Sequence, residues 1–262
     1  MDFSQALRER RNRRRLSQLE LATRAGTTQR YVSFLESGRA EPGREIVIRL
    51  AESLELPLPE RNGLLLAAGY APAYPRTPLA DPVMAPVHTA LRHVLDGHLP
   101  YPAIVADRYG DLVAANPAFT LFTDGAAAGL LEPPVNVYRL ALHPGGMAPR
   151  IVNLAEWAQH IVQRLAAEIE RNPDDRLAAL IAELRAYLPE GRPAAGPLGF
   201  AVPMRTRTAY GELNLITTVT TFATAVDITL AELKLEAFLP MDETTASILA
   251  RRARHPAPRP PE

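Results

Sequence analysis

The chain has 262 residues, 47% of them hydrophobic, which favours two globular domains with ordinary cores. It contains no cysteine, which excludes disulfides, thiolate metal sites and cysteine nucleophiles, and it has no apolar run long enough for a membrane span. We therefore expect a cytoplasmic protein.

The net charge of zero is distributed unevenly along the chain. Residues 1–70 contain twelve arginines and nine acidic residues, whereas residues 71–250 contain thirteen basic and nineteen acidic residues. A basic N-terminal part on an acidic body favours a negatively charged partner at the N-terminus. The six arginines within positions 8–15 can equally be a solvated helix face.

The first 71 residues predict a domain of five short helices. Ser17 and Glu20 have the spacing of a capping box, and Thr28 can cap the helix that follows. Gly26 and Gly38 are typical residues at helix ends. The expected helices cover residues 2–14, 18–25, 29–37, 44–54 and 59–69.

A proline-rich linker is expected over residues 72–86 because proline lacks an amide donor and resists helix formation. A helix should follow it. Ala103–Ala106 and Leu112–Ala115 read as the strands of a β-hairpin, with a turn between them. Amphipathic helices should begin after Asn153 and Asp174.

Alternating residues then predict strands over residues 202–207 and 212–220, the second of them rich in β-branched residues. The pattern of residues 228–238 is ambiguous between helix and strand, and we expect a third strand there. A strand hairpin, helices and three further strands give an α+β order for a domain covering residues 87–245. The basic, proline-rich tail, residues 246–262, is expected to be disordered.

The segment from Leu16 to Gly38 has the pattern of two helices joined by a tight turn, and its second helix begins with polar residues. Such a helix is built to enter the major groove of DNA, where Gln can pair with adenine and Arg with guanine. We expect Gln29, Arg30 and Ser33 to read bases, with Phe34 either touching a thymine methyl or partly buried. The residues expected to meet phosphates are Gln18, Thr28, Ser37 and Arg39.

Residues 7–69 resemble the lambda repressor/Cro-type (XRE) helix-turn-helix family. The resemblance rests on LELA at 19–22, AGT at 25–27, VS at 32–33 and LESG at 35–38. It implies a five-helix domain that binds double-stranded operator DNA. It also implies a structural ion pair between Arg11 and Glu36.

Three further segments are distinctive: NGLLLAAGYAPAYP at 62–75, YPAIVAD at 101–107 and NPAF at 116–119. They resemble one XRE subfamily, whose C-terminal domain is an MmyB-like, PAS-like ligand-binding domain. The resemblance implies an all-α helix-turn-helix domain followed by an α+β PAS-like domain with an antiparallel sheet, whose pocket holds a fatty-acid-like molecule. A carboxylate head would need donors, and the candidates are Asn136, Arg139 and His143.

Two other readings of the second domain stay open: a module for dimerisation or partner binding with a dry core, and an unrecognised enzyme. The sequence contains neither a G-x-S-x-G nor a P-loop motif, so we expect no catalytic residues, no metal and no cofactor other than a bound lipid. We also expect a homodimer, because one helix-turn-helix domain reads few base pairs.

Overall fold

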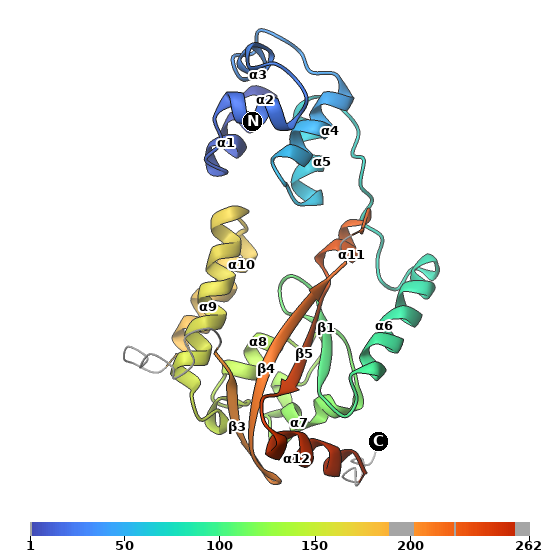
Figure 1. The fold of residues 1–262 in the computed structure, drawn as a ribbon, viewed down its shortest axis with the longest axis vertical. Coiled ribbons are helices and arrows are strands. Elements are labelled where there is room, and N and C mark those ends of the chain that lie inside the picture. The colour runs from blue at the N-terminus through green and yellow to red at the C-terminus, as the bar shows by residue number, and fades with distance from the viewer. Residues whose placement is uncertain (1, 189–201, 223, 255–262) are drawn as a thin grey trace. The chain divides into compact units, whose positions relative to one another are not determined.

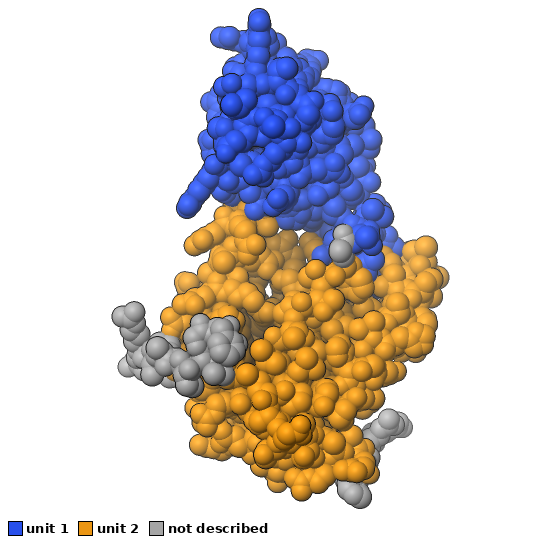
Figure 2. Space-filling model, in the orientation of Figure 1, with its two compact units in different colours: residues 1–79, 223–231 blue, residues 80–222, 232–262 orange. Residues whose placement is uncertain are grey.

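The computed structural model describes residues 2–188, 202–222 and 224–254. The chain divides into two units, one made of residues 1–79 and 223–231 and the other of residues 80–222 and 232–262 (Figure 2). The boundary after residue 79 falls inside the expected linker. No sequence pattern indicated that residues 223–231 would return to the first unit.

The first unit contains the five expected helices (Figure 1). Ser17 and Glu20 form the capping box, and the Thr28 hydroxyl accepts a hydrogen bond from the backbone N–H of Tyr31. Gly26, with a φ of 62°, takes the left-handed conformation that ends the second helix before the turn. The helices are α1 (Phe3–Arg13), α2 (Gln18–Arg24), α3 (Gln29–Glu36), α4 (Arg44–Ser53) and α5 (Leu58–Ala67).

The second unit is built on a five-stranded sheet in which neighbouring strands run antiparallel, in the order β2-β1-β5-β4-β3. The register places Ile104 opposite Glu236 and Thr217 opposite Phe238. The strands are β1 (Ala103–Ala106), β2 (Leu112–Ala115), β3 (Met204–Thr208), β4 (Gly211–Thr221) and β5 (Lys234–Pro240).

Helices pack against this sheet to give an α+β PAS-like domain. One large core joins the sheet residues Ile104, Leu215 and Phe238 to apolar side chains of the helices, such as Trp157 and Leu177. Of the helices in the described ranges, none is long and apolar enough to cross a membrane. The α-helices of the second unit are α6 (Ala85–Gly97), α7 (Thr120–Thr123), α8 (Val137–Leu142), α9 (Leu154–Arg171), α10 (Asp175–Ala186) and α12 (Glu243–Arg254). The short helix α11 (Ile228–Glu232) lies almost entirely in the first unit.

The expected strand over 228–238 is wrong in its first half, because Ile228–Glu232 form the short helix α11 and only Lys234–Pro240 form β5. The Asp227 carboxylate accepts a hydrogen bond from the backbone N–H of Thr229, at 2.8 Å. This is N-capping, which starts a helix despite the β-branched residues that follow.

The expected disorder of the tail is also wrong for its first part, since residues 246–254 belong to α12. This helix buries Ile248 and Leu249, and the Thr245 hydroxyl accepts a hydrogen bond from the backbone N–H of Asn214 in β4. The apolar face of α12 therefore fixes it against the sheet. Residues 255–262 lie outside the described part of the chain.

Candidate functional site

The helix α3 presents its polar leading residues to solvent. Gln29 and Arg30 are exposed, whereas Val32 and Leu35 are fully buried in the core of the first unit. The guanidinium of Arg30 lies 5.2 Å from the centre of the half-buried Phe34 ring, a cation–π distance. The fold thus leaves the first turn of α3 available to a partner and orients Arg30 across its surface.

The residues expected to meet phosphates lie around this helix. Thr28 caps its start, and Ser37 and Arg39 are exposed just after its end. Gln18 is placed differently, because its side-chain amide donates a 2.9 Å hydrogen bond to the carboxylate of Glu36. Gln18 therefore joins α2 to the end of α3, and one of its amide hydrogens is already engaged.

Arg11 and Glu36 form a bidentate ion pair, with Nε and Nη2 of the arginine 2.6 and 2.9 Å from the two carboxylate oxygens. Burial alone would raise the pKa of Glu36. Hydrogen bonds from Arg11 and Gln18 outweigh it and hold that pKa below its ordinary value. The pair is the one that the XRE resemblance implies, and it joins α1 to α3.

Several arginines of the run over residues 8–15 also form contacts within the first unit. Arg8 donates to the backbone carbonyl of Glu36 at 2.8 Å, and Arg10 pairs with Glu60 at 3.1 Å. Arg14 donates to the backbone carbonyl of Glu55. The arginine density of this segment therefore reflects contacts within the unit to a large extent, and is weaker support for DNA binding than α3.

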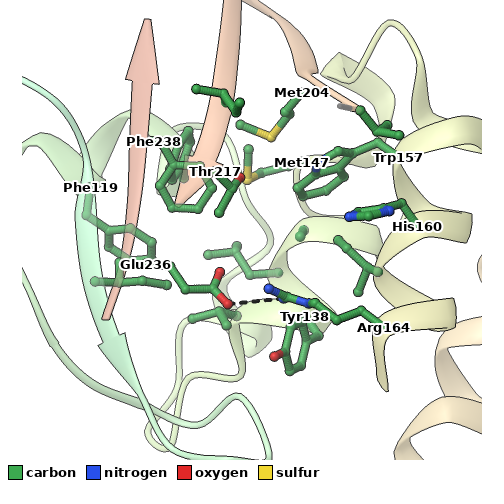
Figure 3. A pocket seen from close by; sticks show the side chains of 18 residues that line it. Phe119, Tyr138, Met147, Trp157, His160, Arg164, Met204, Thr217, Glu236 and Phe238 are labelled. Carbon is green, nitrogen blue, oxygen red and sulfur yellow. Dashed lines mark hydrogen bonds and ion pairs between the residues drawn. The ribbon is translucent and has the colours of Figure 1, made fainter. Parts of the chain in front are cut away.

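The second unit contains a cavity of about 260 Å³ between the sheet and the helices α8 and α9. Figure 3 shows its apolar part, where aromatic and sulfur-containing side chains from several elements meet. Ile104 and Phe238 of the sheet line it together with Met147 and Trp157. Trp157 and Phe119 are thus both core residues and pocket residues.

One end of the cavity is polar. Arg164 of α9 and Glu236 of β5 reach toward each other and pair at 3.1 Å (Figure 3). Burial alone would lower the pKa of Arg164, but the charge of Glu236 raises that pKa above its ordinary value, so the arginine is cationic. Burial raises the pKa of Tyr138, so its hydroxyl remains protonated. His160, one turn before Arg164, is exposed at the rim.

The three residues expected to bind a head group do not line this cavity. Asn136 caps α8 by accepting from the backbone N–H of Arg139, and Arg139 forms a bidentate pair with Glu183 of α10, at 2.7 and 2.8 Å. His143 accepts a hydrogen bond from a backbone amide, and its ring packs against Tyr187. They lie on or beside α8, whose other residues Val137, Tyr138, Leu140 and Ala141 face the cavity.

Arg164 and Glu236 are not among the site residues predicted from the sequence, because each stands in a pattern that is common in folded domains. Arg164 stands in an amphipathic helix, and Glu236 is a single polar residue in an apolar strand. A buried carboxylate within a predicted strand needs a partner, and that signal was available.

Residues 87–251 match the family described as the MmyB-like transcription regulator ligand binding domain, and residues 7–61 match a helix-turn-helix family. The first match covers more than half of the chain. The chain belongs to the MmyB-like transcription regulators. Its first unit is an XRE-type helix-turn-helix domain and its second is the ligand-binding domain of that family.

A comparison with curated proteins gives no match for this regulator. Among solved structures, an RNA-binding light-oxygen-voltage receptor is similar at 15% identity with a TM-score of 0.30. The alignment covers 95% of this chain but 62% of the receptor, so the chain spans less than two thirds of that protein's length. Similarity at this level carries no conclusion about activity.

The Arg11–Glu36 pair should control the stability of the first unit. Replacing Arg11 with Met leaves Glu36 buried without its main partner, and we expect a loss of about 3 kcal/mol in unfolding free energy. Because the pKa of Glu36 is lowered in the fold, the pair's contribution is present at neutral pH. It should be lost as the pH falls below about 4.3, the ordinary glutamate value.

Urea unfolding followed by circular dichroism, at pH 7 and pH 3.5, measures this effect. The only tryptophan, Trp157, lies in the second unit, so its fluorescence reports that unit separately and should not change. Arg13→Met, which alters an exposed arginine of the same helix, is the matched control. Equal stability of the Arg11 and Arg13 variants would contradict the role of the pair.

Proposed function

We propose that this regulator is a cytoplasmic homodimer that reads operator DNA with α3 and responds to a fatty-acid-like molecule bound in the cavity of its second unit. The exposed first turn of α3 supports the DNA-reading part. Gln29 and Arg30 are free of the core, and a side chain of each type can form two hydrogen bonds to one base. Ser33, one turn further along the helix, completes the base-reading set.

The phosphate contacts in this proposal are made by Thr28, Ser37 and Arg39, with the second amide hydrogen of Gln18 as a further donor. Contacts of this kind fix the register of a protein on the duplex but carry no sequence information. Two copies of the domain would read paired half-sites, which raises specificity beyond what one short helix achieves.

The size and lining of the cavity support the second part of the proposal, which is that an alkyl ligand binds there. Its volume of about 260 Å³ is larger than the engineered cavity of about 150 Å³ that stays dry and binds benzene, and lies just below the usual range for small-molecule pockets. Its walls are mostly apolar, and each buried methylene group of an alkyl chain would contribute about 0.8 kcal/mol. A single alkyl chain fits these walls better than a polar metabolite.

A path from the cavity to the first unit is provided by the connection between β4 and β5. Both strands line the cavity, through Thr217 and Glu236 among others, and the chain between them enters the first unit as residues 223–231. There Asp227 accepts a 3.0 Å hydrogen bond from the backbone N–H of Thr77, and the backbone N–H of Ile228 donates to Pro75. A shift of β4 or β5 would thus displace the linker at Pro75 and Thr77.

The linker is in turn fixed to the helix-turn-helix domain by Asn62 of α5. This buried side chain accepts hydrogen bonds from the backbone N–H groups of Ala73 and Tyr74, and donates to the carbonyl of Tyr74 at 2.7 Å. Arg61 stacks on the Tyr74 ring. Movement at Pro75 and Thr77 would therefore be transmitted to α5.

Arg30→Ala should cost about 1–3 kcal/mol in operator binding and relax specificity at one base pair. Arg39→Ala, at an expected phosphate contact, should weaken all sequences alike and reduce the salt slope by about one. Two measurements distinguish the loss of a base contact from the loss of a phosphate contact. Bound sequences are selected from random duplexes, and affinities are then measured across salt concentrations. Unchanged specificity for the Arg30 variant would remove α3 from base reading.

Protein purified under native conditions should carry a ligand. Native mass spectrometry should show a mass excess of a few hundred daltons or less, and released molecules should include an alkyl chain. Delipidated protein should regain ligand with a change in Trp157 fluorescence, because this side chain lines the cavity. A clean apo mass with no fluorescence response to alkyl ligands would favour the dry dimerisation module instead.

Asp227→Ala should uncouple the two units. We expect ligand to change the operator affinity of the wild-type protein but not that of the variant, while ligand affinity measured by Trp157 fluorescence stays the same. The control is Asp81→Ala, because this linker carboxylate accepts a hydrogen bond from Val83 instead. A full ligand response in the Asp227 variant would exclude this path, and equal wild-type affinities with and without ligand would exclude regulation by ligand altogether.

A further inference from the structure

We propose that the ligand's head group is uncharged, so that the molecule is a neutral derivative of a fatty acid, such as an amide or alcohol, and not the free acid. This inference rests on the proposed alkyl ligand and concerns the polar end of the same cavity. Arg164, the cationic side chain that faces the cavity most directly, is already paired with Glu236 at 3.1 Å. Glu236 is only 7% exposed.

Two basic side chains near this pair, Lys234 and Arg108, are themselves engaged by carboxylates. Lys234 of β5 pairs with Glu168 of α9 at 2.7 Å. Arg108 lies 3.4 Å from both Asp174 and Glu232, and 3.9 Å from Glu168. Arg108 and Lys234 are thus engaged by Glu168, Asp174 and Glu232, and neither of the two basic side chains lines the cavity. A carboxylate head would therefore meet Arg164, and it would place a second negative charge beside Glu236.

A carboxylate head would bind Arg164 only by sharing it with Glu236 or by displacing Glu236. Sharing brings two carboxylates together in a poorly hydrated site, and displacement leaves a buried glutamate without its partner. Both outcomes are unfavourable. An ammonium head would face the reverse conflict, since it would compete with Arg164 for Glu236.

An uncharged head avoids both conflicts. A primary amide or a hydroxyl both donates and accepts hydrogen bonds. It can donate to a Glu236 oxygen and accept from a guanidinium N–H of Arg164 without breaking the ion pair. His160 is not part of this pair, because its side chain is exposed to water at the rim.

The test compares four eight-carbon ligands that differ only in the head: octanamide, 1-octanol, octanoate and octylamine. Each is titrated into the delipidated full-length protein at pH 7.5 and followed by Trp157 fluorescence. We expect octanamide or 1-octanol to bind about tenfold tighter than octanoate or octylamine. Octanoate or octylamine binding as tightly as the neutral ligands would overturn the proposal while leaving the alkyl-binding function intact.

Glu236→Gln gives the sharper comparison, because it leaves the positive charge of Arg164 uncompensated. We expect this variant to gain affinity for octanoate specifically, so that the preference for octanamide is lost or reversed. Glu212→Gln is the matched control, since Glu212 is a β4 carboxylate that pairs with Arg205 and does not line the cavity. The thermal unfolding of each variant checks that the domain is folded.

If Glu236→Gln binds octanoate no better than the wild-type protein, the proposed role of Glu236 in excluding acids is wrong. If none of the four ligands changes Trp157 fluorescence in the wild-type protein, the alkyl-binding function itself fails, and the head-group inference fails with it. These results differ from the case in which octanoate binds well, which overturns the head-group inference alone.

Discussion

A buried carboxylate that several elements share holds the helix α3 in place. Glu36 is the last residue of α3, and its side chain has no exposed surface. Arg11 from α1 and Gln18 from α2 both donate to it, and Arg8 donates to its backbone carbonyl. Because the unmet charge of Glu36 would be costly in the core, the three helices can adopt only arrangements that bring these donors together. The exposed first turn of α3 follows from that constraint.

The ligand-binding domain also contains a buried glutamate that is paired with an arginine. Glu236 is again a carboxylate with little exposure that an arginine from another element satisfies. In the first unit the space around the pair is filled by packed helices. In the second the pair faces a cavity, so its remaining donors and acceptors are available. A buried arginine–glutamate ion pair thus joins helices in the first unit and forms the polar end of a pocket in the second.

The local features of the fold could be predicted from the sequence. The capping box at Ser17, the cap at Thr28 and the turn at Gly26 each depend on residues within a few positions of one another, and the structure has all three. The strand predicted at Ile228 is wrong because the side chain of Asp227 caps a helix there. This capping residue is visible in the sequence, directly before the segment whose pattern is ambiguous.

The site of the second domain could not be predicted in the same way, because its contacts join distant residues. Arg139 was a reasonable candidate for a head group until the fold placed Glu183 of α10 beside it. Arg139 lies on α8, which also lines the cavity, but its side chain is directed toward α10. Arg164 and Glu236 are 72 positions apart, and no periodicity links them. Only the register of β5 against β1 and the packing of α9 bring them together.

The contact that holds the linker within the first unit is also long-range, since the hydrogen bond between Thr77 and Asp227 spans 150 positions. Both flanking strands of that connection carry residues of the cavity wall, and Asn62 fixes the linker on the other side. A proline-rich linker alone would act as a spacer and transmit little. Anchored at Tyr74 by Asn62 and at Thr77 by Asp227, it becomes a short segment with both ends held. This is the physical basis for a signal passing from the pocket to the DNA-reading domain in the function we propose, because a segment held at both ends transmits a displacement that a free chain would absorb.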